Sequence, residues 1–140
     1  MKYAVSVLAV LAAPVLYGFL CVPTINLLMS SNADLLNDMG GTYDVGLTLQ
    51  AEAVQLIVLL IIGFAVAAIA RFKPMLHVGI AVAVMLAIGV SVQLSFWDAM
   101  LIWHHFVFFG LIAVCLPLGG MIAGKVLKPK ALDLNLDEGA

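Results

Sequence analysis

The stretch that decides the fold is residues 47–70, LTLQAEAVQLIVLLIIGFAVAAIA, in which Glu52 is the one charged side chain. A helix needs about 20 apolar residues to cross the hydrocarbon core of a membrane. A helix also satisfies its backbone hydrogen bonds within the segment, which lipid cannot do. Residues 47–70 therefore predict a transmembrane helix with a carboxylate near its start.

Three further stretches of this kind flank it, at residues 3–29, 75–96 and 102–124. The chain is 65% hydrophobic and 10% charged, whereas soluble domains are about 45–50% apolar and about 25% charged. We predict an all-α integral membrane protein: a four-helix transmembrane bundle in a single domain, residues 1–124, followed by a flexible cytoplasmic tail, 125–140. The first stretch also resembles a signal peptide, but it continues far beyond the short apolar core of such signals, so we expect an uncleaved span.

The charges orient the four spans. Lys and Arg near span ends accumulate on the cytoplasmic side. With both termini cytoplasmic, all 6 cations lie inside: Lys2, Arg71, Lys73, Lys125, Lys128 and Lys130. The acids of the connections then lie outside: Asp34, Asp38, Asp44 and Asp98. We expect two antiparallel hairpins, with both termini in the cytoplasm, in the bacterial inner (cytoplasmic) membrane. The net charge of -2 argues against binding of nucleic acid.

Two segments outside the spans carry their own patterns. The first outer loop has the pattern of a short amphipathic helix. Ser31 and Asp34 resemble a capping box, Leu35, Leu36 and Met39 fall on one helical face, and Gly40 and Gly41 end the helix. We predict a short amphipathic helix there, with a solvated loop as the alternative. The tail alternates leucines with Asp and Asn at 132–137, which is typical of a strand that adds to a partner's sheet, while its acidic composition favours a disordered tail.

Polar side chains concentrate in the outer half of the predicted spans. The candidate binding residues are Asn26, Glu52, Gln55, Gln93, Ser95, Asp98 and His104. An ionisable group at membrane depth is expensive and indicates a functional site, which makes Glu52 the leading residue. We predict a polar crevice that opens to the outer face above an apolar inner half. Hydrogen bonding between helices and solvation of Glu52 at the interface are the alternatives.

Metal and cofactor binding find little support. His104 and His105 are weak metal candidates, because adjacent residues of a helix point about 100° apart. His77 lies at the other end of its span, too far away to share a haem iron with His104. We expect no cofactor and no metal, and we expect Cys21 and Cys115 to be free thiols, since their depths in the membrane differ.

Small residues at a spacing of four indicate faces on which helices pack closely. They are Gly79, Ala83 and Ala87 in the third span, and Gly120 and Gly124 in the fourth. For the third span we expect packing within the chain. The same faces also suit assembly with another subunit.

No catalytic constellation is visible in the sequence, so we expect no enzyme. The first hypothesis is a small accessory, assembly or immunity-type protein that binds another membrane protein through its transmembrane faces. The alternative is a small homo-oligomeric transporter or channel that uses the crevice around Glu52 for an ion, a proton or a small solute. The expected partners are the lipid bilayer and either another membrane protein or a second copy of the chain.

Overall fold

The computed structural model describes residues 2–70 and 72–127, and most of them lie in four long helices. These are α1 (Lys2–Ser30), α2 (Val45–Ala70), α3 (Pro74–Ser95) and α4 (Ile102–Val126), with the short 3-10 helices η1 (Ala33–Leu35) and η2 (Trp97–Ala99) between them. All four long helices are long and apolar enough to cross a membrane, and the described ranges contain no strand. The all-helical prediction is confirmed, and so are four candidate spans. Most of the predicted tail, 128–140, lies outside the described residues.

Local sequence explains where the helices begin. The Oδ1 atom of Asp44 accepts a hydrogen bond from the backbone N–H of Leu47 at 2.7 Å, which caps the first turn of α2. Lys73 has a left-handed backbone (φ 47°) and precedes Pro74, which stands in the first turn of α3. Proline suits this position because the first helical N–H groups have no partner within the helix. Three residues, 71–73, thus connect α2 to α3.

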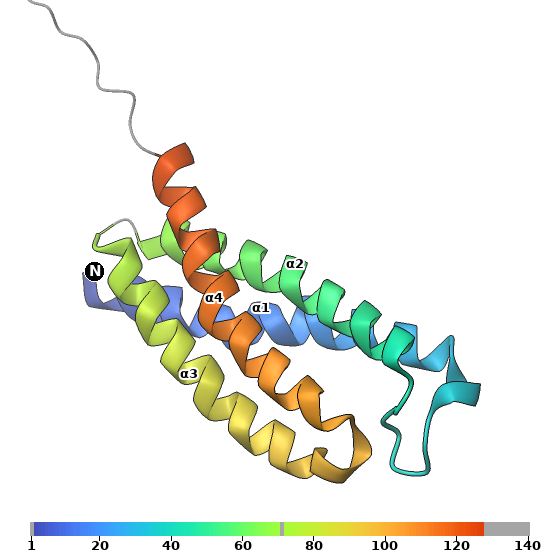
Figure 1. Cartoon of the computed structure of the whole chain (residues 1–140). Helices are drawn as coiled ribbons and strands as arrows, with labels where there is room; N and C mark the ends of the chain where they lie inside the picture. Colours follow the sequence, from blue (N-terminus) through green and yellow to red (C-terminus); the bar gives the residue numbers. More distant parts are fainter. Residues whose placement is uncertain (1, 71, 128–140) are drawn as a thin grey trace, which may run out of the picture.

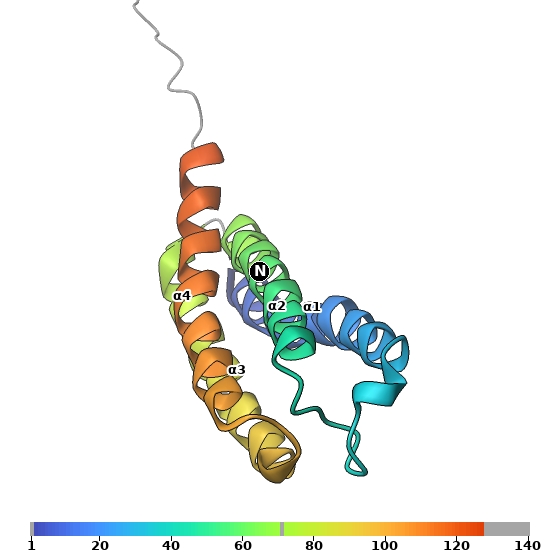
Figure 2. The ribbon, with the colours of Figure 1, turned by 45° about the vertical axis from the view of Figure 1, so that its right-hand side comes forward.

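α2 and α4 form the most intimate helix pair of the molecule. They run in the same direction, while α1 packs mainly on α2 and α3 mainly on α4 (Figure 1). We call the end that carries residues 31–44 the loop end. Toward this end α1 and α3 diverge, as both views show (Figures 1 and 2).

Two glycines allow α2 and α4 to touch through their backbones. A Cβ atom at Gly63 would lie 2.0 Å from the carbonyl oxygen of Leu116, and one at Gly119 would lie 2.1 Å from that of Leu60. Around this contact the side chains of Ile62, Val66, Ile112 and Leu116 are completely buried. The interface between α2 and α4 is therefore tightly packed and apolar in this part of the molecule.

The connection between α1 and α2 differs from the predicted amphipathic helix. Only η1 is helical; Leu36 and Thr42 then form an isolated antiparallel bridge, and Gly40 turns the chain with φ 75°. The Oδ1 atom of Asn37 accepts hydrogen bonds from the N–H groups of Met39 and Gly41. Asparagine side chains compete with helical hydrogen bonds in this way, which favours a turn.

Candidate functional site

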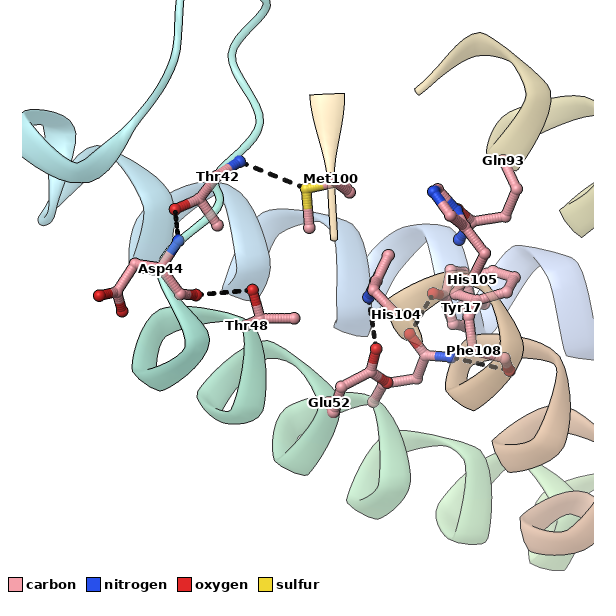
Figure 3. Close-up of polar contacts among 11 residues, drawn as sticks. Tyr17, Thr42, Asp44, Thr48, Glu52, Gln93, Met100, His104, His105 and Phe108 are labelled. Carbon is pink, nitrogen blue, oxygen red and sulfur yellow. Dashed lines mark hydrogen bonds and ion pairs between the residues drawn. The ribbon is translucent and has the colours of Figure 1, made fainter. Parts of the chain in front are cut away.

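α2 and α4 bring one carboxylate and one imidazole together near the loop end. Oε1 of Glu52 shares a hydrogen bond with Nδ1 of His104 (Figure 3). Glu52 is 6% exposed and His104 is 9% exposed. Oε2 of Glu52 is fully enclosed and has no hydrogen-bond partner, the one such side-chain atom among the described residues.

The second ring nitrogen of His104 is also unused. Nε2 makes no hydrogen bond to the described residues. Among the described side chains, Glu52 Oε2 is the one polar atom that is fully enclosed and has no partner, so His104 Nε2 retains some exposure. When Nδ1–H donates to the carboxylate, Nε2 carries a lone pair and can accept a hydrogen bond or a proton. The pair thus offers an oriented acceptor, with Glu52 able to balance a positive charge on the ring.

His104 lines a cavity of about 200 Å³. All four long helices contribute to its wall, which combines polar, aromatic and aliphatic residues: Ile25, Asn26, Met29, Ala51, Val92, Gln93, Phe96, His104 and Phe108. The amide of Asn26 makes no hydrogen bond to the described residues. The cavity therefore offers two unused polar groups, one on α1 and one on α4.

The loop before α2 covers this cavity at the loop end. Gly40, Gly41 and Met100 line it there, and a Cβ atom at Gly41 would lie 2.2 Å from the carbonyl oxygen of Ala99. Three bonds hold the loop on the turn between α3 and α4: Asn37 Nδ2 donates to Ala99 O at 2.9 Å, Thr42 N to Met100 Sδ at 3.4 Å, and the Tyr43 hydroxyl to Asp98 O. At the loop end, the loop before α2 and the turn between α3 and α4 thus cover the cavity.

His105 has a different environment from its neighbour. Its Nδ1 lies 2.5 Å from Oε1 of Gln93, its Nε2 lies 3.2 Å from the carbonyl oxygen of Trp97, and its ring stacks on the Trp97 indole at 4.3 Å. It is 1% exposed. Both partner atoms are acceptors, so a neutral ring donates to one of them, and these contacts hold α4 to the end of α3.

Gln55 lies one turn below Glu52 on α2 and connects three helices. Its Nε2 donates to the carbonyl oxygen of Phe108 at 3.4 Å, and its Oε1 accepts from the Tyr17 hydroxyl at 3.4 Å. Thr48, one turn above Glu52, donates to Asp44 O at 2.8 Å. Of this stripe on α2, Glu52 alone keeps a polar atom without a partner.

The structure gathers some of the predicted binding residues and separates others. Asn26, Gln93 and His104 line one cavity, and Glu52 bonds to His104. Ser95 is exposed and bonds to Ser91 O within its own helix, while Asp98 is exposed and contributes only its backbone carbonyl. Neither residue borders the cavity.

The predicted packing residues also separate. Gly79, Ala83 and Ala87 lie on an exposed face of α3, and Cβ atoms at Gly79 and Gly124 would meet no neighbour within 4 Å. A Cβ atom at Gly120 would lie 2.9 Å from the Val78 side chain. The third-span stripe therefore does not pack within the chain, contrary to expectation, because α3 turns this face away from its neighbours.

In the described ranges, no three His, Cys, Asp or Glu side chains gather where they would hold a metal ion. Both cysteines are free thiols, as predicted. The candidate binding residues include Asn26, Gln93 and His104 of the cavity wall and leave out its other residues, among them Val92, Phe96 and Phe108. Apolar residues in an apolar span give no signal that separates a cavity wall from the core.

Comparison with known proteins finds no matching family model, no similar curated protein and no similar solved structure.

Proposed function

We propose that this chain is a multi-pass membrane protein that binds a small ligand at the Glu52–His104 pair. The observation that carries the proposal is the unused Nε2 of His104, a residue that lines a cavity of about 200 Å³ and is bonded to a buried carboxylate whose second oxygen has no partner. Combined with the charge pattern, the proposal puts the loop end outside the cytoplasm and both termini inside, in a bacterial inner membrane. The site then lies in the outer half of a four-helix bundle.

A purely structural role explains the pair less well. Hydrogen bonds between membrane helices are commonly made by Ser, Thr, Asn, Gln and His side chains, which need bury no charge. Gln55 is such a contact, with both amide atoms bonded. Glu52 buries an ionisable group and leaves one oxygen unpaired, which costs about 1–3 kcal/mol. A contact that served packing alone would not need this unpaired oxygen.

The packing favours binding over conduction. Gly63 follows Glu52 by 11 residues on α2, which corresponds to roughly 16 Å along a helix. There α2 touches α4 backbone to backbone, among buried apolar side chains. At this contact a solute from the Glu52–His104 pair would meet a closely packed, apolar interface between α2 and α4.

The test is to purify the full chain and its Glu52→Gln variant in lipid nanodiscs and to compare the small molecules extracted from each by mass spectrometry. Gln55→Glu serves as a control for overall disturbance of α2. We expect wild type to retain a molecule that Glu52→Gln loses at least about tenfold. The same molecules in equal amounts in both preparations would contradict the proposal.

A second candidate is the accessory role, in which the chain binds another membrane protein. The exposed stripe of Gly79, Ala83 and Ala87 favours it, because none of the described helices covers that face. Ala83→Leu would then abolish co-purification of a partner from mild detergent, whereas Gly110→Leu, at another open position, would not. Recovery of the chain alone in both cases would count against this role.

A further inference from the structure

The cavity beside His104 continues into a second, apolar cavity. This groove has a volume of about 490 Å³ and lies between α1 and α3, with Phe108 of α4 as its third side. The two cavities share Ile25, Asn26, Val92, Phe96 and Phe108. The polar head site and the long apolar groove thus lie next to each other.

The groove opens where the molecule is least packed. Only 17% of the most apolar window of α1 is buried, against 44% for α2, and α1 diverges from α3 toward the loop end (Figure 2). From Pro14 to Ile25 the groove follows α1 along its middle, which is at membrane depth for a spanning helix. Its open side therefore faces lipid, while the roof of residues 40 and 41 covers the end nearest the water.

The charges of the site restrict the head group. Glu52 brings a carboxyl group, and the described lysines stand at the other end of the molecule, with Lys2 at the start of α1, Lys73 before α3 and Lys125 in the last turn of α4. An anionic head would meet a carboxylate without a compensating cation. His104 Nε2 accepts a hydrogen bond, and the Asn26 amide both donates and accepts. An uncharged hydroxyl-bearing head matches these groups.

The walls favour a ring. Phe96 and Phe108 border both cavities where they join, and aromatic side chains pair with flat rings beyond the simple burial of area. An enclosed cavity of about 150 Å³ holds one benzene molecule, so the cavity of about 200 Å³ accommodates a substituted six-membered ring. The groove of about 490 Å³ accommodates an alkyl or isoprenoid tail.

We propose that the ligand is an uncharged lipid with a hydroxylated aromatic head, of the quinol or alkylphenol class, which enters sideways from the membrane between α1 and α3. Its hydroxyl donates to Nε2 of His104, and its tail lies in the α1–α3 groove. The inference rests on the proposed function and adds the class of ligand and its route.

The probe is decylhydroquinone, titrated against the full chain in nanodiscs, with its dimethyl ether as the matched compound that cannot donate a hydrogen bond. We expect the ether to bind at least about tenfold more weakly, since one hydrogen bond to an ionisable group is lost. His104→Phe should reduce the affinity for the hydroquinone by a similar factor and leave that for the ether unchanged. Equal affinities for the two compounds, or no binding of the hydroquinone, would overturn the inference.

The route has its own matched pair of variants. Gly18 lines the groove and Gly110 does not, and at both positions a Cβ atom would meet no neighbour within 4 Å. Gly18→Leu should therefore fill the groove and weaken binding about tenfold, while Gly110→Leu should have no effect. Equal binding by both variants would exclude the lateral route. If the molecule lost from Glu52→Gln proves to be a polar solute, the ligand class fails and the proposed function stands.

Discussion

At the scale of single residues, two adjacent histidines have opposite roles. His105 is enclosed, in contact with an acceptor at each nitrogen and stacked on Trp97, whereas His104 has one bonded and one unused nitrogen beside a cavity. The first arrangement stabilises the fold. The second keeps a ring oriented by its neighbour and free to bind, which is how carboxylates position functional imidazoles.

The difference predicts separate effects of substitution. His105→Ala should lower the free energy of unfolding by about 2–4 kcal/mol, because it removes a buried ring and its hydrogen bonding. His104→Phe should change stability less, since the new ring fills the same space, while it weakens hydroquinone binding at least about tenfold. Unfolding in mixed micelles measures the first quantity and hydroquinone titration the second. Loss of stability from His104→Phe as large as that from His105→Ala would contradict this division.

The Glu52–His104 bond itself is measurable by a double-mutant cycle with Glu52→Ala and His104→Ala. We expect a coupling energy of about 1 kcal/mol, within the range found for hydrogen bonds between membrane helices. Tyr17→Phe, which removes a hydroxyl bonded at 3.4 Å to Gln55, combined with His104→Ala should show none. A coupling near zero for Glu52 and His104 would mean that the two side chains do not bond in the membrane.

The sequence identifies Glu52 because a carboxylate within an apolar span is rare. It does not select the partner of Glu52, because His104 and His105 point about 100° apart and either can face α2. The rotation of α4 decides between them. That rotation depends on the contact of Gly63 with Leu116 and of Gly119 with Leu60. The contact involves backbone atoms, so its only trace in the sequence is a single contacting glycine in each helix.

At the scale of elements, the α2–α4 contact sets the geometry of the site. Gly63→Ala should lower the free energy of unfolding by more than about 2 kcal/mol, since its Cβ atom would lie 2.0 Å from Leu116 O and the helices must move apart. Gly110→Ala, at an open position, should instead be neutral or raise stability by up to about 1 kcal/mol through helix propensity. Similar effects of the two substitutions on unfolding in micelles would show that the backbone contact is absent.

The element that sequence reasoning missed is the first loop. Leu35, Leu36 and Met39 lie at helical spacing, but Asn37 bonds to its own backbone neighbours and to Ala99 O. The second bond spans 62 residues, and no local pattern reports a contact of that kind. The long helices were predictable to within two residues at each end, because apolar length alone fixes them.

At the scale of the whole molecule, the charge distribution predicts the orientation of the chain in the membrane. Reporters fused after Met39 and after Lys130 should give an outer-side signal for the first and a cytoplasmic signal for the second, because the cations accumulate inside. Exchanging Lys73 for Glu should weaken this preference without inverting it, since other cations remain. An outer-side signal after Lys130 would contradict the orientation and put the site in the cytoplasmic half.

The most direct test of the proposed site is to follow the His104 imidazole while the ligand binds. The chain contains 3 histidines, so ¹⁵N-histidine NMR of the protein in nanodiscs resolves each ring, with His104→Phe and His105→Phe for assignment. On addition of decylhydroquinone, the Nε2 resonance of His104 should shift while both nitrogens of His105 stay unchanged. An unchanged His104 resonance at saturating hydroquinone, or equal shifts at both rings, would contradict a ligand site at the Glu52–His104 pair.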